Sequence, residues 1–175
     1  MKLNHYIDHT LLKPEASPQA IIKLCQEAID YEFYAVCVSG CYAYLAAEQI
    51  RQSNVKLAVT VGFPLGSLTS EAKVQEARIA IKQGADEICY IDNVATLYNT
   101  KNLSSFVSNT AKNVFIPLSV GGGIRSLDDI KEMLIAGADK ICINSAVIND
   151  IKFLESAAKM VGSSNISVLI QAIKV

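Results

Sequence analysis

The residues of this chain that are best suited to chemistry surround a triple glycine, Gly121 to Gly123. These glycines follow the apolar run FIPLSV and precede a helical pattern that starts near Leu127. Because glycine has no side chain, its backbone N–H group can face a ligand, and a strand followed by a glycine turn and a helix start is a common phosphate site. The pattern therefore predicts that Gly122 and Gly123 donate backbone hydrogen bonds to a phosphorylated small molecule.

A second pair of polar residues, Asn144 and Ser145, follows the apolar run KICI. Both can donate from backbone and side chain. The carboxyl ends of neighbouring parallel strands meet at one edge of a sheet, so we expect this pair and the glycine loop to converge on one anion. Two alternatives stay open: the glycines form a tight turn without a ligand, and Asn144 and Ser145 act as helix-cap residues.

Short β-rich runs alternate with amphipathic stretches along the whole chain, which indicates repeated strand–helix units. The helical ends carry suitable signals, such as Ser17 before Pro18 and the stop signals Gly84 and Gly137. The predicted strands are Tyr6–Leu11, Ala35–Val38, Lys56–Gly62, Glu87–Asp92, Phe115–Val120, Lys140–Asn144 and Ile166–Ala172. The predicted helices are Pro18–Tyr31, Tyr42–Gln52, Ser70–Gln83, Leu103–Lys112, Leu127–Ala136 and Ile151–Val161.

This regular alternation predicts an α/β protein of the (βα)8 TIM-barrel type, with parallel strands and outer helices. The alternative, an open doubly wound sheet, fits less well because polar or glycine motifs follow nearly every strand. About seven strand signals are present where a closed barrel has eight, so the barrel is expected to be incomplete. Residues 1–175 are predicted to form a single domain.

Composition excludes several classes of function. The chain has 51% hydrophobic and 19% charged residues and a formal net charge of -1, which argues against a nucleic-acid-binding surface. It contains no apolar run long enough for a membrane span and no recognisable leader peptide, so a cytoplasmic location is expected. The five cysteines are predicted to be free thiols, and neither a metal site nor a cofactor is expected.

The run YIDHTLLKPEASP and the motif GFPLG resemble deoxyribose-phosphate aldolases, and this resemblance extends from the start to about residue 84. It implies a lysine that attacks a carbonyl to form a Schiff base. Asp8 and Cys37 match active-site positions of that family. However, the family's catalytic aspartate is replaced by Cys89, and the only lysine of the sixth strand, Lys140, lies at its amino end.

From about residue 84 to residue 175, the motifs DEICYIDN, VGGGIRS and GADKICINSA resemble the cyclase subunit of imidazole glycerol phosphate synthase. This resemblance implies two strand-end aspartates as general acid and base, with ammonia from a glutaminase partner. Asp8 lies on the first strand, and Asp92 matches a strand-end acid of the cyclase. In the last strand Gln171 stands where the second catalytic aspartate is expected, and glutamine cannot exchange a proton near neutral pH.

The two resemblances meet at the phrase GADE and predict a chimera-like chain, residues 1–84 aldolase-like and 85–175 cyclase-like. The primary hypothesis is a phosphate-binding barrel of lyase ancestry, cyclase-like, with Asp8, Asp92 and Gln171 as candidate catalytic residues. Two alternatives stay open, a Schiff-base aldolase and a non-catalytic engineered or truncated chimeric barrel. The unpaired edges of an open barrel also predict a homo-oligomer or other self-association.

Overall fold

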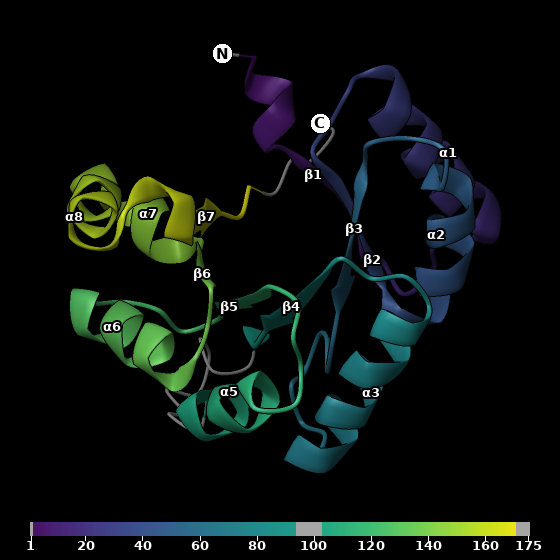
Figure 1. The fold of residues 1–175 in the computed structure, drawn as a ribbon. Coiled ribbons are helices and arrows are strands. Elements are labelled where there is room, and N and C mark those ends of the chain that lie inside the picture. Colours follow the sequence, from purple (N-terminus) through teal and green to yellow (C-terminus); the bar gives the residue numbers. More distant parts are fainter. Residues whose placement is uncertain (1, 94–102, 171–175) are drawn as a thin grey trace. The chain divides into compact units, whose positions relative to one another are not determined.

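Seven strands form one sheet in the order β1 to β7 in the computed structural model of this chain (Figure 1). Residues 2–93 and 103–170 are described. The pairs β1–β2, β2–β3, β3–β4, β5–β6 and β6–β7 are parallel. Parallel strands in sequence order, joined through helices, are the arrangement that was predicted.

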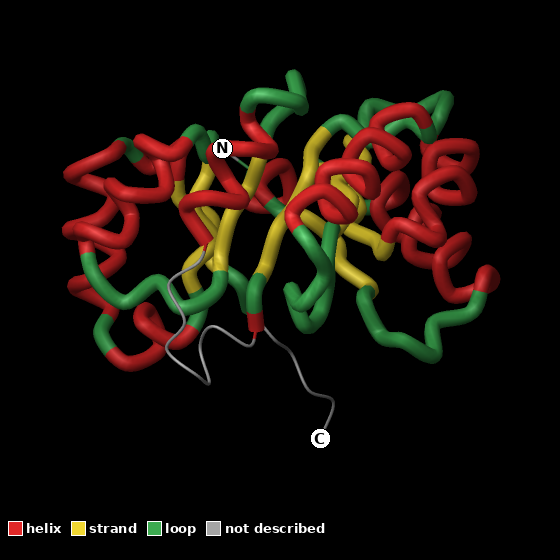
Figure 2. The backbone as a smooth tube through the Cα atoms, turned by 90° about the horizontal axis from the view of Figure 1, so that it is seen from below, coloured by secondary structure: helices red, strands yellow, loops and turns green. Residues whose placement is uncertain are grey.

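The strands are β1 Asp8–Leu11, β2 Ala35–Ser39, β3 Lys56–Thr60, β4 Glu87–Ile91, β5 Leu118–Gly121, β6 Lys140–Ile143 and β7 Ile166–Val168. The α-helices are α1 Pro18–Asp30, α2 Ala43–Ile50, α3 Ser70–Lys82, α5 Leu103–Ala111, α6 Leu127–Ala136, α7 Ser145–Asn149 and α8 Ile151–Val161. Three short 3-10 helices are η1 Leu3–Tyr6, η2 Gly40–Tyr42 and η3 Ser163–Asn165. Figure 2 colours these elements by type, with the connecting loops in green.

Most predicted boundaries agree with the structure to within two residues, and three differences have physical causes. β5 begins at Leu118 rather than Phe115, because Pro117 has no backbone N–H for the sheet. The residues before β1 form η1 instead of extended chain. The single-turn helix α7 was not predicted, since five residues are too few to show helical periodicity.

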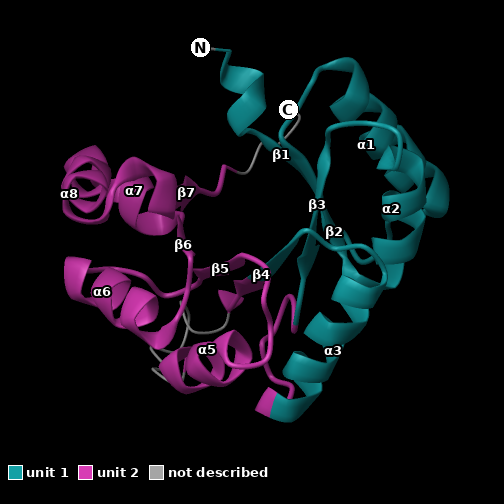
Figure 3. Ribbon diagram, in the orientation of Figure 1, with its two compact units in different colours: residues 1–61, 71–89 teal, residues 62–70, 90–175 magenta. Residues whose placement is uncertain are grey.

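The chain divides into two compact units, which Figure 3 shows in different colours. The first unit comprises residues 1–61 and 71–89, and the second comprises residues 62–70 and 90–175. The chain passes between the units after residues 61, 70 and 89, and the last of these points lies within β4. That residues 1–175 form a single domain stays a prediction.

In the first unit, alternate residues of the strands separate into two faces, as the two-residue period of a strand requires. Val36, Val38, Leu57, Val59 and Ile88 are fully buried on one face. The opposite face carries a cluster of Cys37, Ala58 and Cys89, against which Leu12 packs. Helices α1 and α2 contact β1, β2 and β3 of this unit.

In the second unit, the core forms where β4 meets α5. The rings of Tyr90 and Phe106 lie 4.2 Å apart between centroids, and both side chains are almost completely buried. Ile130 of α6 and Ile141 of β6 are also fully buried. Helix α6 ends at Gly137, whose φ of 113° is a left-handed conformation that favours glycine. In the ranges 2–93 and 103–170, no helix combines the length and the apolar character of a membrane span.

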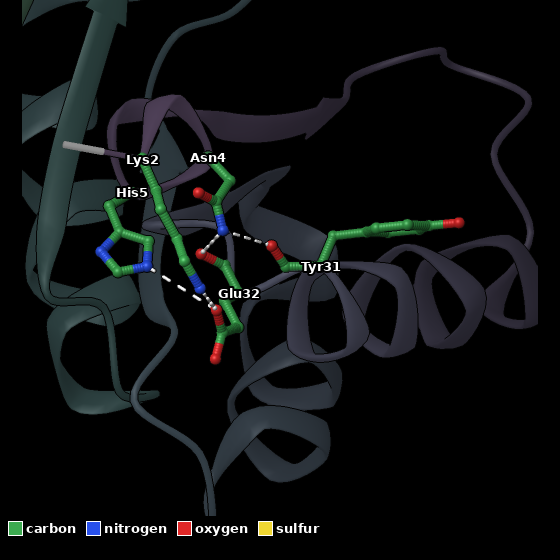
Figure 4. A network of polar contacts seen from close by, with 5 residues as sticks. All are labelled: Lys2, Asn4, His5, Tyr31 and Glu32. Atoms are coloured by element: carbon green, nitrogen blue, oxygen red, sulfur yellow. Dashed lines mark hydrogen bonds and ion pairs between the residues drawn. The ribbon is translucent and has the colours of Figure 1, made fainter.

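A polar network attaches η1 to the end of α1 in the first unit (Figure 4). The side-chain amide of Asn4 donates to the carbonyl oxygens of Tyr31 at 2.7 Å and Glu32 at 3.2 Å. The Glu32 carboxylate lies 3.2 Å from Lys2 Nζ and 3.8 Å from His5 Nε2. The hydrogen bond from Lys2 is the main cause that lowers the pKa of Glu32. Asn4 thus binds carbonyls that the helix itself leaves without partners.

We predict that Asn4→Ala destabilises the chain by about 1 kcal/mol, because two carbonyl acceptors at the end of α1 lose their donor. Lys2→Ala should have a much smaller effect, since its ion pair is exposed to solvent. Urea unfolding followed by circular dichroism measures both differences. A loss from Lys2→Ala equal to that from Asn4→Ala would contradict this assignment.

A second prediction concerns the hydroxyl of Thr110 on α5, which is fully buried and has no hydrogen-bond partner among the described residues. Replacing an unpaired buried hydroxyl by a methyl group of the same shape removes a desolvation cost. Thr110→Val should therefore raise the free energy of unfolding, by about 1 kcal/mol. Thr10→Val is the control, because its exposed hydroxyl donates to the Asp8 carbonyl oxygen at 2.9 Å, and this substitution should not raise stability. A clear loss of stability in Thr110→Val would refute the prediction.

Candidate functional site

The glycine loop and the Asn144 loop leave neighbouring strands of the second unit, β5 and β6. Gly121, the last residue of β5, is in register with Cys142 of β6. A Cβ atom at Gly121 would lie only 2.7 Å from the Cβ atom and the carbonyl oxygen of Cys142. The two strands approach closely because Gly121 has no side chain. Residues 122–123 and 144–145 therefore begin from adjacent strand ends, as predicted.

Gly122 packs directly on the backbone of Asp92, which follows β4. A Cβ atom at Gly122 would lie 2.1 Å from the carbonyl oxygen of Asp92 and 2.7 Å from its amide nitrogen. The Asp92 amide in turn donates to the carbonyl oxygen of Gly121 at 3.0 Å. Gly122 and Gly123 have φ values of 103° and 70°. Both the space and the conformation require glycine at position 122.

The start of α6 differs from the prediction, in which the dipole of this helix attracts the anion. Ser126 Oγ accepts from the Asp129 amide, while Asp129 Oδ2 accepts from the amides of Arg125 and Ser126, in a capping box. These amides bond to side chains of the chain itself, and the carboxylate of Asp129 places negative charge at this terminus. The glycine loop is therefore a better source of donors for an anion than the amides of Arg125, Ser126 and Asp129.

Asn144 and Ser145 lie directly after β6. The carbonyl oxygen of Asn144 accepts from the amides of Val147 at 3.0 Å and Ile148 at 3.3 Å, which starts α7. Asn144 is the N-cap residue of α7, as the helix-cap alternative proposed, but its side chain makes no capping hydrogen bond. Ser145 is the first residue of α7 and is exposed. Both residues thus occupy the predicted position at the carboxyl end of β6.

The carboxylate of Asp92 lies beside the loop that follows β3. A Cβ atom at Gly66 would lie 2.9 Å from the Tyr90 hydroxyl and 3.1 Å from Asp92 Oδ2. The side chains of Tyr90 and Asp92 therefore lie on the same side of the backbone. On this side Tyr90 also contacts Phe106 of α5. Burial, and secondarily the charge of Asp92, raises the pKa of Tyr90 to about 12, so this phenol stays protonated at neutral pH.

Of the other two candidate catalytic residues, one belongs to the first unit and one is not described. Asp8 is an exposed residue of the first unit and the first residue of β1, in register with Ala35 at the start of β2. It is thus on the first strand as predicted, at the amino end. Gln171 lies outside the described residues. Only Asp92 of the three is placed beside the glycine loop within the second unit, and its catalytic role stays a prediction.

Two positions that correspond to aldolase active-site residues, Cys37 and Cys89, lie on one face of the first unit. Cys37 and Cys89 are buried in the same cluster, and Cys89 Sγ lies 3.9 Å from Glu87 Oε1. Glu87 is only 6% exposed and was not singled out from the sequence, although it belongs to the phrase GADE. Lys140 is the first residue of β6, at its amino end. The described part of β6 therefore holds no lysine at its carboxyl end, where barrel active sites lie.

The cysteines are all free, and four of the five are buried. Burial raises the pKa of the Cys25 thiol to about 11, which keeps it protonated and unreactive at neutral pH. No group of three or more histidine, cysteine or acidic residues in the described ranges could hold a metal ion.

Comparisons with known proteins point to the aldolases for much of the chain. A segment of 97 residues is 52% identical to deoxyribose-phosphate aldolase from Mycoplasma mycoides and covers 55% of this chain and 50% of that protein. A segment of 139 residues is 41% identical to the enzyme of the same name from Natranaerobius thermophilus and covers 79% of this chain and 61% of that protein. The chain thus spans about half to three fifths of the length of these relatives.

Solved structures show the same fold. A deoxyribose-phosphate aldolase from Coccidioides immitis superposes with a TM-score of 0.76 at 24% identity, over 95% of this chain and 71% of that one. A protein described as "QR15, an Aldolase" gives a TM-score of 0.76 at 25% identity, over 96% and 80% of the two chains. The predicted TIM-barrel class is confirmed.

The similarities to two families overlap instead of meeting at Gly84. The 97-residue aldolase match is longer than the 84-residue part assigned to that family. The family model for the histidine biosynthesis proteins, in turn, matches residues 66–174 and so begins within the aldolase-like part. Because the two matches overlap, they do not confirm the predicted junction between two families at Gly84. Because the model matches more than half of the sequence and includes the glycine loop and both polar residues after β6, this chain belongs to the histidine biosynthesis protein family.

Proposed function

We propose that this chain binds a phosphorylated small molecule at the carboxyl ends of β5 and β6, in a cyclase-like barrel of lyase ancestry. The observation that carries the proposal is the approach of these two strand ends at Gly121, where a Cβ atom would lie 2.7 Å from Cys142. Because the two strand ends are adjacent, the glycine loop and the pair Asn144 and Ser145 begin close together. Backbone and hydroxyl groups of two loops then lie at one edge of the sheet, where we place the anion.

The family supports this class of ligand. The matched segment, residues 66–174, contains every candidate phosphate-binding residue: Gly122, Gly123, Asn144 and Ser145. Two relatives of the other part of the chain bear the name deoxyribose-phosphate aldolase, which also names a phosphorylated sugar. A sugar-phosphate-derived compound is therefore the substrate class we propose, with Asp92 as the nearest candidate acid or base.

The alternative of a Schiff-base aldolase has specific observations both for and against it. In favour, Asp8 and Cys37 match that family and two similar relatives carry its name. Against it, Cys89 replaces the catalytic aspartate and contacts the buried Glu87, while Lys140 lies at the amino end of β6. A Schiff base needs an accessible amine beside the bound carbonyl. We therefore rank this activity below anion binding.

The remaining hypotheses stay predictions. A non-catalytic barrel, a chimeric origin and a cytoplasmic location all agree with the same phosphate site and are not distinguished by it. A glutaminase partner would be expected only if the cyclase-like reaction is intact. Self-association through the edge strands β1 and β7 follows from the sheet order, because edge strands offer backbone groups to another chain.

Phosphate should raise the melting temperature of the parent chain. At ten times its Kd, a ligand that binds only the folded state contributes about 1.4 kcal/mol, which corresponds to about 3–6 °C for a chain of this size. Gly123→Asp should abolish this increase, because its carboxylate would occupy the place of the anion. Aspartate tolerates the left-handed φ of 70° at this position better than most residues.

Gly162→Asp is the matched control for this thermal-shift measurement. Gly162 also has a positive φ, 89°, so a substitution there strains the backbone as it does at Gly123, and the nearest atom to an added Cβ is Ser164 Oγ at 3.9 Å. The same carboxylate is thus introduced into open space, away from β5 and β6, and the response to phosphate should persist. Absence of any phosphate response in the parent, or an unchanged response in Gly123→Asp, would refute the proposed site.

A third measurement tests the aldolase alternative. Incubation with deoxyribose 5-phosphate and sodium borohydride reduces any lysine imine to a stable amine and so adds the sugar phosphate to the protein mass. We expect no adduct, since β6 has no lysine at its carboxyl end within the described residues. The Mycoplasma mycoides relative, treated in parallel, serves as the positive control. An adduct on this chain would favour the Schiff-base aldolase and contradict the proposed cyclase-like function.

A further inference from the structure

We infer that the loop after β3, residues 62–66, controls the affinity of the anion site through Asp92, so that Gly66 and Asp92 are positioning residues. The inference rests on the proposed anion site and concerns residues that have no place among its donors. All the residues involved belong to the second unit. The loop consists of the GFPLG motif, and its two glycines are Gly62 and Gly66.

The first contact joins this loop to the side chain of Asp92. The loop folds back on itself, because the Gly66 amide donates to the carbonyl oxygen of Gly62 at 2.7 Å. Gly66 has a φ of 64° and faces the carboxylate so closely that an added Cβ would lie 3.1 Å from both Cγ and Oδ2 of Asp92. The Tyr90 hydroxyl would be nearer still, at 2.9 Å. The buried Tyr90 ring cannot move away easily, since it packs on Phe106.

The second contact joins the backbone of Asp92 to the glycine loop. The Asp92 amide donates to Gly121, and its carbonyl oxygen would lie 2.1 Å from a Cβ atom at Gly122. A shift of Asp92 by even a few tenths of an ångström must therefore move Gly122 as well. Gly122 precedes the proposed donor Gly123. Hydrogen-bond energy falls steeply when donors lose their alignment, so small displacements at Asp92 should alter anion affinity.

The direct test is a pair of glycine variants in a phosphate titration followed by the amide resonances of Gly122 and Gly123 in NMR spectra. Gly66→Ala should push Tyr90 and Asp92 and weaken phosphate binding by at least about threefold, a typical coupling between residues in contact. It should also shift both amide resonances before phosphate is added. Gly162→Ala, with a similar positive φ but open space around its Cβ, should change neither the affinity nor these resonances.

A rescue experiment separates positioning from general loss of structure. Tyr90→Phe removes the hydroxyl that lies nearest to the added methyl group. In the double variant Gly66→Ala/Tyr90→Phe, phosphate affinity should return at least halfway to the value of Tyr90→Phe alone. A mere loss of stability would not be reversed by a second deletion in the core. Failure of this rescue, with both variants folded, would overturn the route through Tyr90 and Asp92.

A further comparison keeps the inference testable if Gly66→Ala does not fold. Asp92→Asn and Asp92→Ala both remove the negative charge, but only asparagine keeps the side-chain shape that Gly66 contacts. Asp92→Ala should bind phosphate at least about threefold more weakly than Asp92→Asn. Equal affinities would overturn the inference and leave the anion site standing. If the parent itself does not bind phosphate, the proposed function fails and this inference with it.

Discussion

The structure of the second unit depends on one steric constraint, the absence of side chains where β4, β5 and β6 end. A Cβ atom at Gly121 or Gly122 would approach backbone atoms of Cys142 or Asp92 to within 2.7 and 2.1 Å. Backbone atoms of hydrogen-bonded strands cannot move aside as the end of a flexible side chain can. Gly121 and Gly122 therefore determine how closely the ends of β4, β5 and β6 approach one another. The candidate phosphate-binding residues follow directly after β5 and β6.

The electrostatics of the site follow from the same arrangement. The capping box at Ser126 and Asp129 occupies amides at the start of α6, and the Asp129 carboxylate offsets part of the helix-dipole contribution, which is about 0.3–1 kcal/mol at an exposed site. Hydrogen bonds from loop donors to a charged acceptor contribute about 1.5–3 kcal/mol each. Two or three such bonds outweigh this offset, and a modest phosphate affinity is still expected.

The sequence was sufficient for the strand and helix order and for the glycine loop, because periodicity and glycine placement are local signals. It did not predict that the Asp92 carboxylate lies beside Gly66 and Tyr90, since that depends on which side of β4 each residue takes and on a loop distant in sequence. Pro117 delayed the start of β5, an effect that the apolar run FIPLSV concealed. The capping box also has a local sequence signal, a serine followed three residues later by an aspartate.

The overlap of the two family similarities has a structural counterpart. Gly66 belongs to the GFPLG motif, which resembles aldolases, and also to the segment 66–174 that matches the histidine biosynthesis proteins, together with Asp92 and Gly122. Gly66 can lie this close to Asp92 because glycine has no side chain. The residues for proton transfer and for Schiff-base formation face no comparable packing requirement, which explains how Cys89 and Lys140 can depart from the aldolase pattern while the barrel scaffold is kept.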